Sequence, residues 1–72
     1  MNKIALIESI SSKYLDVDLY EIYEGKKYYT VLLKDKFDKG ICFLSDCKSI
    51  QNELKCKMTT LDDGNVIMEV EK

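Results

Sequence analysis

Two β-rich runs in the first half of the chain give the clearest pattern of hydrophobic and polar positions. Residues 17–23 and 28–33 are rich in Val, Leu, Ile and Tyr, and a Glu-Gly-Lys-Lys stretch separates them. Runs of this length around a glycine predict a β-hairpin. We place its two-residue turn at Gly25 and Lys26, with the type II′ geometry that a glycine in the first position favours.

The expected pairing across this hairpin follows from the position of the turn. Tyr23 then faces Tyr28 and Glu24 faces Lys27, so that aromatic rings and opposite charges meet across the strands. A turn one residue earlier sets Tyr23 against Lys26 instead. We prefer the first register for that reason.

The two faces of the expected hairpin differ in polarity. The more apolar face is expected to pack on a helix and carries Tyr20, Ile22, Tyr29, Val31 and Leu33. The opposite face carries Val17, Leu19, Glu21, Tyr23, Tyr28, Thr30, Leu32 and Lys34. Because one helix covers only one face of a sheet, this second face is solvated, curled on itself or used for binding.

A helix is predicted over residues 46–58, where apolar positions recur three and four residues apart. Ser45 or Asp46 serves as its N-cap. The apolar stripe of this helix consists of Cys47, Ile50, Leu54 and Met58. The flanking segments are expected to be a loop, a short apolar strand, a turn and a last strand, over residues 34–40, 41–44, 62–65 and 66–71.

The first segment, residues 3–11, is compatible with two structures. A strand places Ile4, Leu6 and Ile10 on one face. A helix gathers Ile4, Leu6, Ile7, Ile10 and Tyr14 in one half of the helical wheel. The isoleucine and serine content of the segment favours the strand.

These elements predict a single α+β domain over residues 1–72. The expected order is β-β-β-β-α-β, with about five strands in an antiparallel sheet and one helix packed on one face. The alternative, with a helical first segment, is α-β-β-β-α-β.

Composition narrows the chemistry that the chain offers. All eleven basic residues are lysines, His, Pro and Trp are absent, and the net charge is −2. Without His there is no side chain that ordinarily titrates near neutrality, and without Arg there is no bidentate grip on phosphate or guanine. We therefore expect no catalytic residues and no enzymatic activity. The abundance of Lys, Ile, Tyr, Asp and Asn is typical of an AT-rich genome.

Neither a metal nor a cofactor is expected. The carboxylate pairs Asp16/Asp18 and Asp62/Asp63 do not have the spacing of an EF-hand loop. The three cysteines follow neither a zinc nor a redox spacing, and their odd number indicates reduced thiols. The apolar run at residues 4–7 is too short for a signal peptide or a membrane span. We therefore expect a cytoplasmic protein with no membrane partner.

Cys56 is the candidate reactive thiol. In a helix over residues 46–58 it lies opposite the apolar stripe, beside Lys48 and Lys55. An exposed thiol among lysines has a lowered pKa and reacts more readily.

The candidate partner-binding residues are Tyr23, Lys26, Lys27 and Tyr28, because tyrosine is enriched where proteins meet. They indicate a small non-enzymatic protein that binds another protein or a second copy of itself. Such a protein acts as an accessory factor, regulator or inhibitor, including one encoded by a phage or mobile element and directed at a host enzyme. The alternatives are nucleic-acid binding through Tyr and Lys, which the acidic balance disfavours, and a self-assembling structural subunit.

Overall fold

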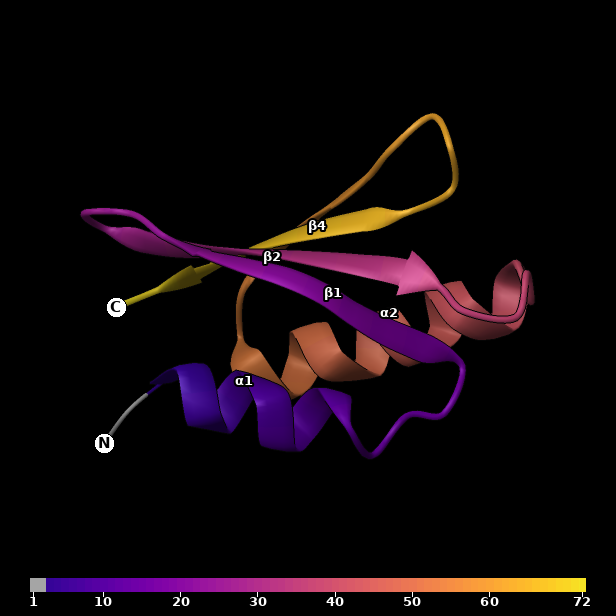
Figure 1. Ribbon diagram of the computed structural model, residues 1–72, viewed down its shortest axis with the longest axis horizontal. Helices are drawn as coiled ribbons and strands as arrows, with labels where there is room; N and C mark the ends of the chain where they lie inside the picture. The colour runs from indigo at the N-terminus through magenta and orange to yellow at the C-terminus, as the bar shows by residue number, and fades with distance from the viewer. Residues whose placement is uncertain (1–2) are drawn as a thin grey trace.

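A computed structural model describes residues 3–72 and arranges them as two helices and one four-stranded antiparallel sheet (Figure 1). The elements are α1 (Lys3–Ser11), β1 (Val17–Glu24), β2 (Tyr28–Asp35), α2 (Ile41–Leu54), β3 (Lys57–Thr60) and β4 (Val66–Glu71). The strand order in the sheet is β1-β2-β4-β3, so β1 and β3 are its edges. The α+β class is confirmed, although the sheet has fewer strands than expected and a second helix.

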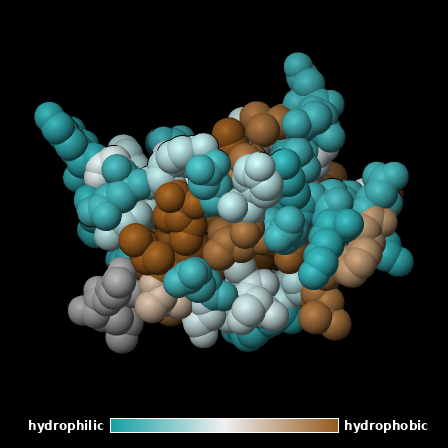
Figure 2. Space-filling view, viewed as in Figure 1, coloured by the Kyte–Doolittle hydropathy of each residue, from teal (hydrophilic) through white to brown (hydrophobic). Residues whose placement is uncertain are grey.

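Both helices lie on the same side of the sheet (Figure 1). The core fills the space between the two layers and consists of Ile7, Ile10, Val17, Val31, Leu33, Phe43, Cys47, Ile50, Val66, Met68 and Val70. On the side of the molecule seen in Figure 2, hydrophobic side chains gather in a band between α1 and the sheet. On the opposite side of the sheet, which we call the open face, none of residues 3–72 forms a helix.

The first segment is a helix, so the preference for a strand was wrong and the helical alternative for this segment is correct. The observed order, α-β-β-α-β-β, differs from the α-β-β-β-α-β that went with that alternative. Ile7 and Ile10, one helical turn apart, are buried in the core beneath β1. This packing outweighs the β-propensity of isoleucine, which reflects a fit to a half-buried sheet surface more than a backbone preference. The second helix thus explains how a chain this short covers one side of a whole sheet.

The second helix begins five residues earlier than expected and ends four residues earlier. Residues 41–44, expected as a strand, form its first turn, and Phe43 extends the buried stripe of Cys47 and Ile50 back by four residues. The helix ends at Leu54 because Lys55 adopts the left-handed conformation, with φ 53°. Four apolar residues in a row fit either a buried strand or a helix, so their periodicity did not decide between them.

Neither Ser45 nor Asp46 caps this helix. Its N-cap is Gly40, which has a positive φ of 57°. The Asp35 carboxylate at the end of β2 accepts hydrogen bonds from the backbone N–H groups of Lys39 and Gly40, each 2.8 Å long. One carboxylate therefore joins the centre of the sheet to the start of α2.

β3 occupies residues that were expected to end the helix. Met58, assigned to the helical stripe, faces Met68 across the β3–β4 hairpin. The hairpin closes with a 2.8 Å bond from the N–H of Leu61 to the carbonyl of Asn65. The Asp63 carboxylate holds the turn by accepting bonds from the backbone and side-chain amide groups of Asn65.

The first hairpin has a different register from the expected one. Tyr23 faces Thr30, and the turn is at Lys26 and Lys27. Before it, the N–H of Gly25 donates a 2.8 Å bond to the carbonyl of Tyr28. A Cβ on Gly25 would lie 3.0 Å from that carbonyl oxygen, so any other residue would force the oxygen to move by a few tenths of an ångström.

A β-bulge in β1 reverses the predicted faces of part of that strand. The register shifts between Leu19 and Glu21, which leaves Tyr20 as the extra residue. Val17 is buried in the core, whereas Tyr20, expected to pack on the helix, is 55% exposed. The assignment of Tyr20 to the core was therefore wrong, and so was that of Val17 and Leu19, which packs against the core, to the opposite face.

Candidate binding surface on the open face

The open face has an apolar centre with a polar and aromatic surround. Strand alternation directs to this face Asp18, Tyr20, Glu21, Tyr23, Tyr28, Thr30, Leu32, Lys34, Lys57, Thr59, Ile67, Glu69 and Glu71. At its centre Leu32 of β2 faces Ile67 of β4, and both are half-buried. The two aliphatic side chains are shielded only by their neighbours in the sheet, because both helices lie on the other side.

Tyr23 is an exposed aromatic residue of this face with a side-chain hydrogen bond. Its hydroxyl donates a hydrogen bond to the carboxylate of Glu21, two residues earlier on the same face. This bond, helped by desolvation, raises the pKa of Tyr23 above its ordinary value. The hydroxyl is thus fixed while 54% of the residue stays accessible to a partner.

Tyr20 is the residue that sequence reasoning missed. The bulge turns it onto the open face, where the Lys34 ammonium lies 3.6 Å from the centroid of its ring. Such a cation–π contact orients both groups. No sequence signal marked this residue, because a bulge is not visible in the alternation of a strand.

The four predicted site residues lie along the end of the β1–β2 hairpin. Tyr23 belongs to the β1 edge, together with Tyr20, whereas Tyr28 is half-buried and faces Glu71 of β4. Tyr28 helps to line a polar hollow of about 280 Å³ with Lys55, Cys56, Lys57, Glu69 and Glu71. Lys26 and Lys27 are exposed at the hairpin tip. Tyr23 and Tyr28 therefore share the open face as diagonal neighbours, and Tyr28 also borders the hollow.

The open face carries more acidic than basic side chains, with Asp18, Glu21, Glu69 and Glu71 against Lys34 and Lys57. Asp18 and Lys34 face each other across β1 and β2, and Lys57 faces Glu69 across β3 and β4. A surface that follows a nucleic-acid backbone is predominantly basic. This face does not have that character.

The cysteines are distributed differently from the expectation. Cys56 lies after α2 rather than on its exposed side, and it is half-buried, whereas Cys42 is exposed. Burial raises the pKa of the Cys56 thiol instead of lowering it, and burial raises that of Cys47 to about 12. The placement assumed for Cys56 was wrong, and its reactivity stays a prediction.

Two further findings concern the described part of the chain. Among residues 3–72 no group of three or more His, Cys, Asp or Glu side chains is arranged to hold a metal ion. Neither described helix is long and apolar enough to cross a membrane.

Comparison with known proteins gives no relative. No family model matches the chain, and neither a curated protein nor a solved structure matches it at a significant level.

Proposed function

We propose that this protein acts by binding another protein through the open face of its sheet. The observation that carries the proposal is the pairing of exposed aromatic rings, Tyr20 and Tyr23, with the apolar centre at Leu32 and Ile67. Tyrosine supplies a large contact area at little cost in conformational entropy, and it is enriched in protein interfaces. An apolar centre with a polar surround is the usual arrangement of such an interface.

The charges indicate what the partner presents. The hairpin tip carries Lys26 and Lys27, both exposed, and neither belongs to the ion pairs of the described residues, Lys13–Glu53 and Lys72–Glu24. A partner with aliphatic or aromatic side chains opposite the tyrosines and acidic groups opposite the tip is complementary to this surface. Binding of this kind suits a non-enzymatic accessory factor, regulator or inhibitor. A reducing compartment such as the cytoplasm is consistent with the three free thiols.

The test is an affinity capture from the native host, in which the wild-type chain identifies the partner and variants locate the surface. The variant with both Tyr20→Ser and Tyr23→Ser is expected to fold and to lose the partner. The matched control is Leu15→Ser, since Leu15 is 82% exposed but lies in the turn before β1. Retained binding by the folded double variant would exclude this surface. Recovery of salt-sensitive nucleic acid instead of a protein would favour the nucleic-acid alternative.

A further inference from the structure

The edge strand β3 has backbone groups that the described chain does not pair. The bond from Leu61 to Asn65 fixes the alternation of the β3–β4 ladder, so Thr59 and Lys57 direct their backbone groups toward β4. Met58 and Thr60 direct theirs away from β4, to the outer edge. No strand lies on that side. An unprotected edge of this kind is a template for another strand.

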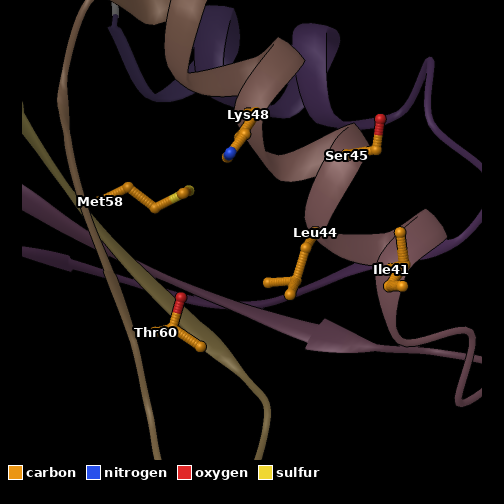
Figure 3. A pocket seen from close by; sticks show the side chains of 6 residues that line it. All are labelled: Ile41, Leu44, Ser45, Lys48, Met58 and Thr60. Atoms are coloured by element: carbon orange, nitrogen blue, oxygen red, sulfur yellow. The ribbon is translucent and has the colours of Figure 1, made fainter.

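The same two residues form one wall of a groove on the helix side of the edge. The groove has a volume of about 350 Å³ and is lined by Ile41, Leu44, Ser45, Lys48, Met58 and Thr60. Figure 3 shows Leu44 and Lys48 reaching from α2 toward the side chains of Met58 and Thr60. Ile41, at the rim, is 84% exposed. An added strand would therefore meet both unpaired backbone groups and apolar side chains.

The charges along this edge are polarised. Lys55 and Lys57 stand at its beginning, and Asp62 and Asp63 stand just beyond its end. All four are exposed, and none of them belongs to the ion pairs found among the described residues. A strand with a basic beginning and an acidic end is complementary to its own antiparallel copy.

We infer that β3 pairs antiparallel with β3 of a second copy of this chain, which joins the two sheets into one. A two-fold axis at Thr59 sets Met58 of each copy opposite Thr60 of the other, and these are the residues with outward backbone groups. Thr59 then meets Thr59 on the open face, a favourable cross-strand pair. The basic beginning of each strand lies beside the acidic end of the other, and the Met58 side chains enter the grooves.

This inference does not rest on the proposed function, and the two can fail separately. β3 forms one edge of the sheet, and β1, which carries Tyr20 and Tyr23, forms the other edge. Dimerisation leaves these tyrosines uncovered. A dimer that keeps its structure in the Tyr20/Tyr23 variant, or a partner that binds a monomeric β3 variant, distinguishes the two surfaces.

The first experiment measures self-association of the full chain by sedimentation equilibrium up to about 1 mM. The wild type is expected to dimerise. Thr60→Pro removes an outward N–H without removing a bond to β4, a change that edge strands tolerate. It is expected to raise the dissociation constant about tenfold or more, since symmetry removes the bond twice. The matched control is Glu24→Pro, which removes an outward N–H from the β1 edge and is expected to leave the dimer unchanged.

The second experiment exchanges charges and does not depend on how well a proline is tolerated. Lys55→Glu makes both ends of β3 acidic, and Asp62→Lys adds a basic residue at the acidic end. Each variant alone is expected to associate several-fold more weakly than the wild type. An equimolar mixture is expected to associate more tightly than either variant alone, because one end of the heterodimer keeps the wild-type charges and the other brings the exchanged charges together. A monomeric wild type, a folded Thr60→Pro variant that still dimerises fully, or a mixture no tighter than its components would each overturn the inference.

Discussion

The two edges of the sheet differ in how they are protected. β1 carries a bulge at Tyr20 and several acidic side chains, and the N–H of Val17 at its start already donates to the carbonyl of Tyr14. β3 is short and regular, and it lies beside a groove. Bulges and charges are the usual means by which an edge avoids pairing with another chain. Exposure alone therefore does not make an edge available for pairing, because an irregular backbone such as a bulge disfavours an added strand.

The helix layer strengthens the same contrast. α1 packs beneath β1, and its C-terminal end is tied to α2 by two interactions with Glu53. The Lys13 ammonium forms a 2.6 Å ion pair with this carboxylate, and the Tyr14 hydroxyl donates to it at 2.6 Å. β3 has no helix tied over it in this way, which leaves the groove at that edge.

The largest expected effect comes from removing the support under the sheet. Phe43 in the first turn of α2 is fully buried, and we expect Phe43→Ala to lower the free energy of unfolding by about 3–5 kcal/mol. Ile41, two residues earlier, is exposed on the groove, and Ile41→Ala should cost less than about 0.5 kcal/mol. Urea titration followed by circular dichroism measures both. Equal losses would contradict the assignment of residues 41–44 to the helix.

Removing the bulge should make the two edges alike. With Tyr20 deleted, Val17, Leu19 and Ile22 follow a regular alternation toward the helices, and β1 becomes a flat edge. We expect a folded protein that forms higher oligomers, because both edges can then pair. Light scattering as a function of concentration detects this. A variant in which Tyr20 is replaced by Ser keeps the bulge and serves as control; if both behave alike, the bulge does not protect β1.

Acidification should loosen the β1 side before the β3 side. The hydrogen bond from Lys13, followed by that from Tyr14, holds the pKa of Glu53 below its ordinary value. A carboxylate whose pKa is lowered in the folded state stabilises the protein fully at pH values above the ordinary glutamate pKa of about 4.3. This contribution is lost as the pH falls through the lowered pKa. The protection of the α1 amides against hydrogen exchange, corrected for the intrinsic pH dependence of exchange, is therefore expected to fall below about pH 4.

A matched variant separates this clamp from general acid unfolding. Glu53→Gln should raise the hydrogen exchange of α1 modestly at neutral pH and make it less sensitive to acid. Unchanged exchange in α1 would mean that the ion pair, which is exposed to solvent, adds nothing measurable.

The smallest expected effect concerns the order in which the three free thiols react. Since the thiolate is the reactive form, a raised pKa slows alkylation. We expect the exposed Cys42 to react first, Cys56 next and Cys47 last. Mass mapping after a short treatment at neutral pH gives the order. Labelling of Cys56 ahead of Cys42 would restore the original expectation for that residue.

Much of this fold could be predicted because its signals are local. The runs at residues 17–23 and 28–33 predicted the first hairpin, and Cys47 and Ile50 correctly marked the buried side of a helix. The first segment was ambiguous because isoleucines fit both periodicities. β3 was not predicted because Met58 fits the spacing of the helical stripe. In the structure, the left-handed conformation of Lys55 ends the helix before Met58.

The candidate surface was predicted less well, for a physical reason. Tyr23 does lie on the open face, but a single extra residue at Tyr20 changes which side chains accompany it. A shift of one residue exchanges the two faces of a strand. The turn at Lys26 and Lys27 instead shifted the pairing by two positions, which leaves Tyr23 and Tyr28 on the same face but no longer directly opposite each other.

The strand order also has a consequence for how the chain folds. β4 follows every other described strand in sequence, yet it lies between β2 and β3 in the sheet. During synthesis from the N-terminus, β3 therefore emerges before the strand that connects it to the rest of the sheet. Until β4 closes the long loop back to β2, the β1–β2 hairpin and the helices have only part of their core. Pairing over such a sequence separation slows folding. The folding rate should therefore depend on how fast β4 pairs with β2.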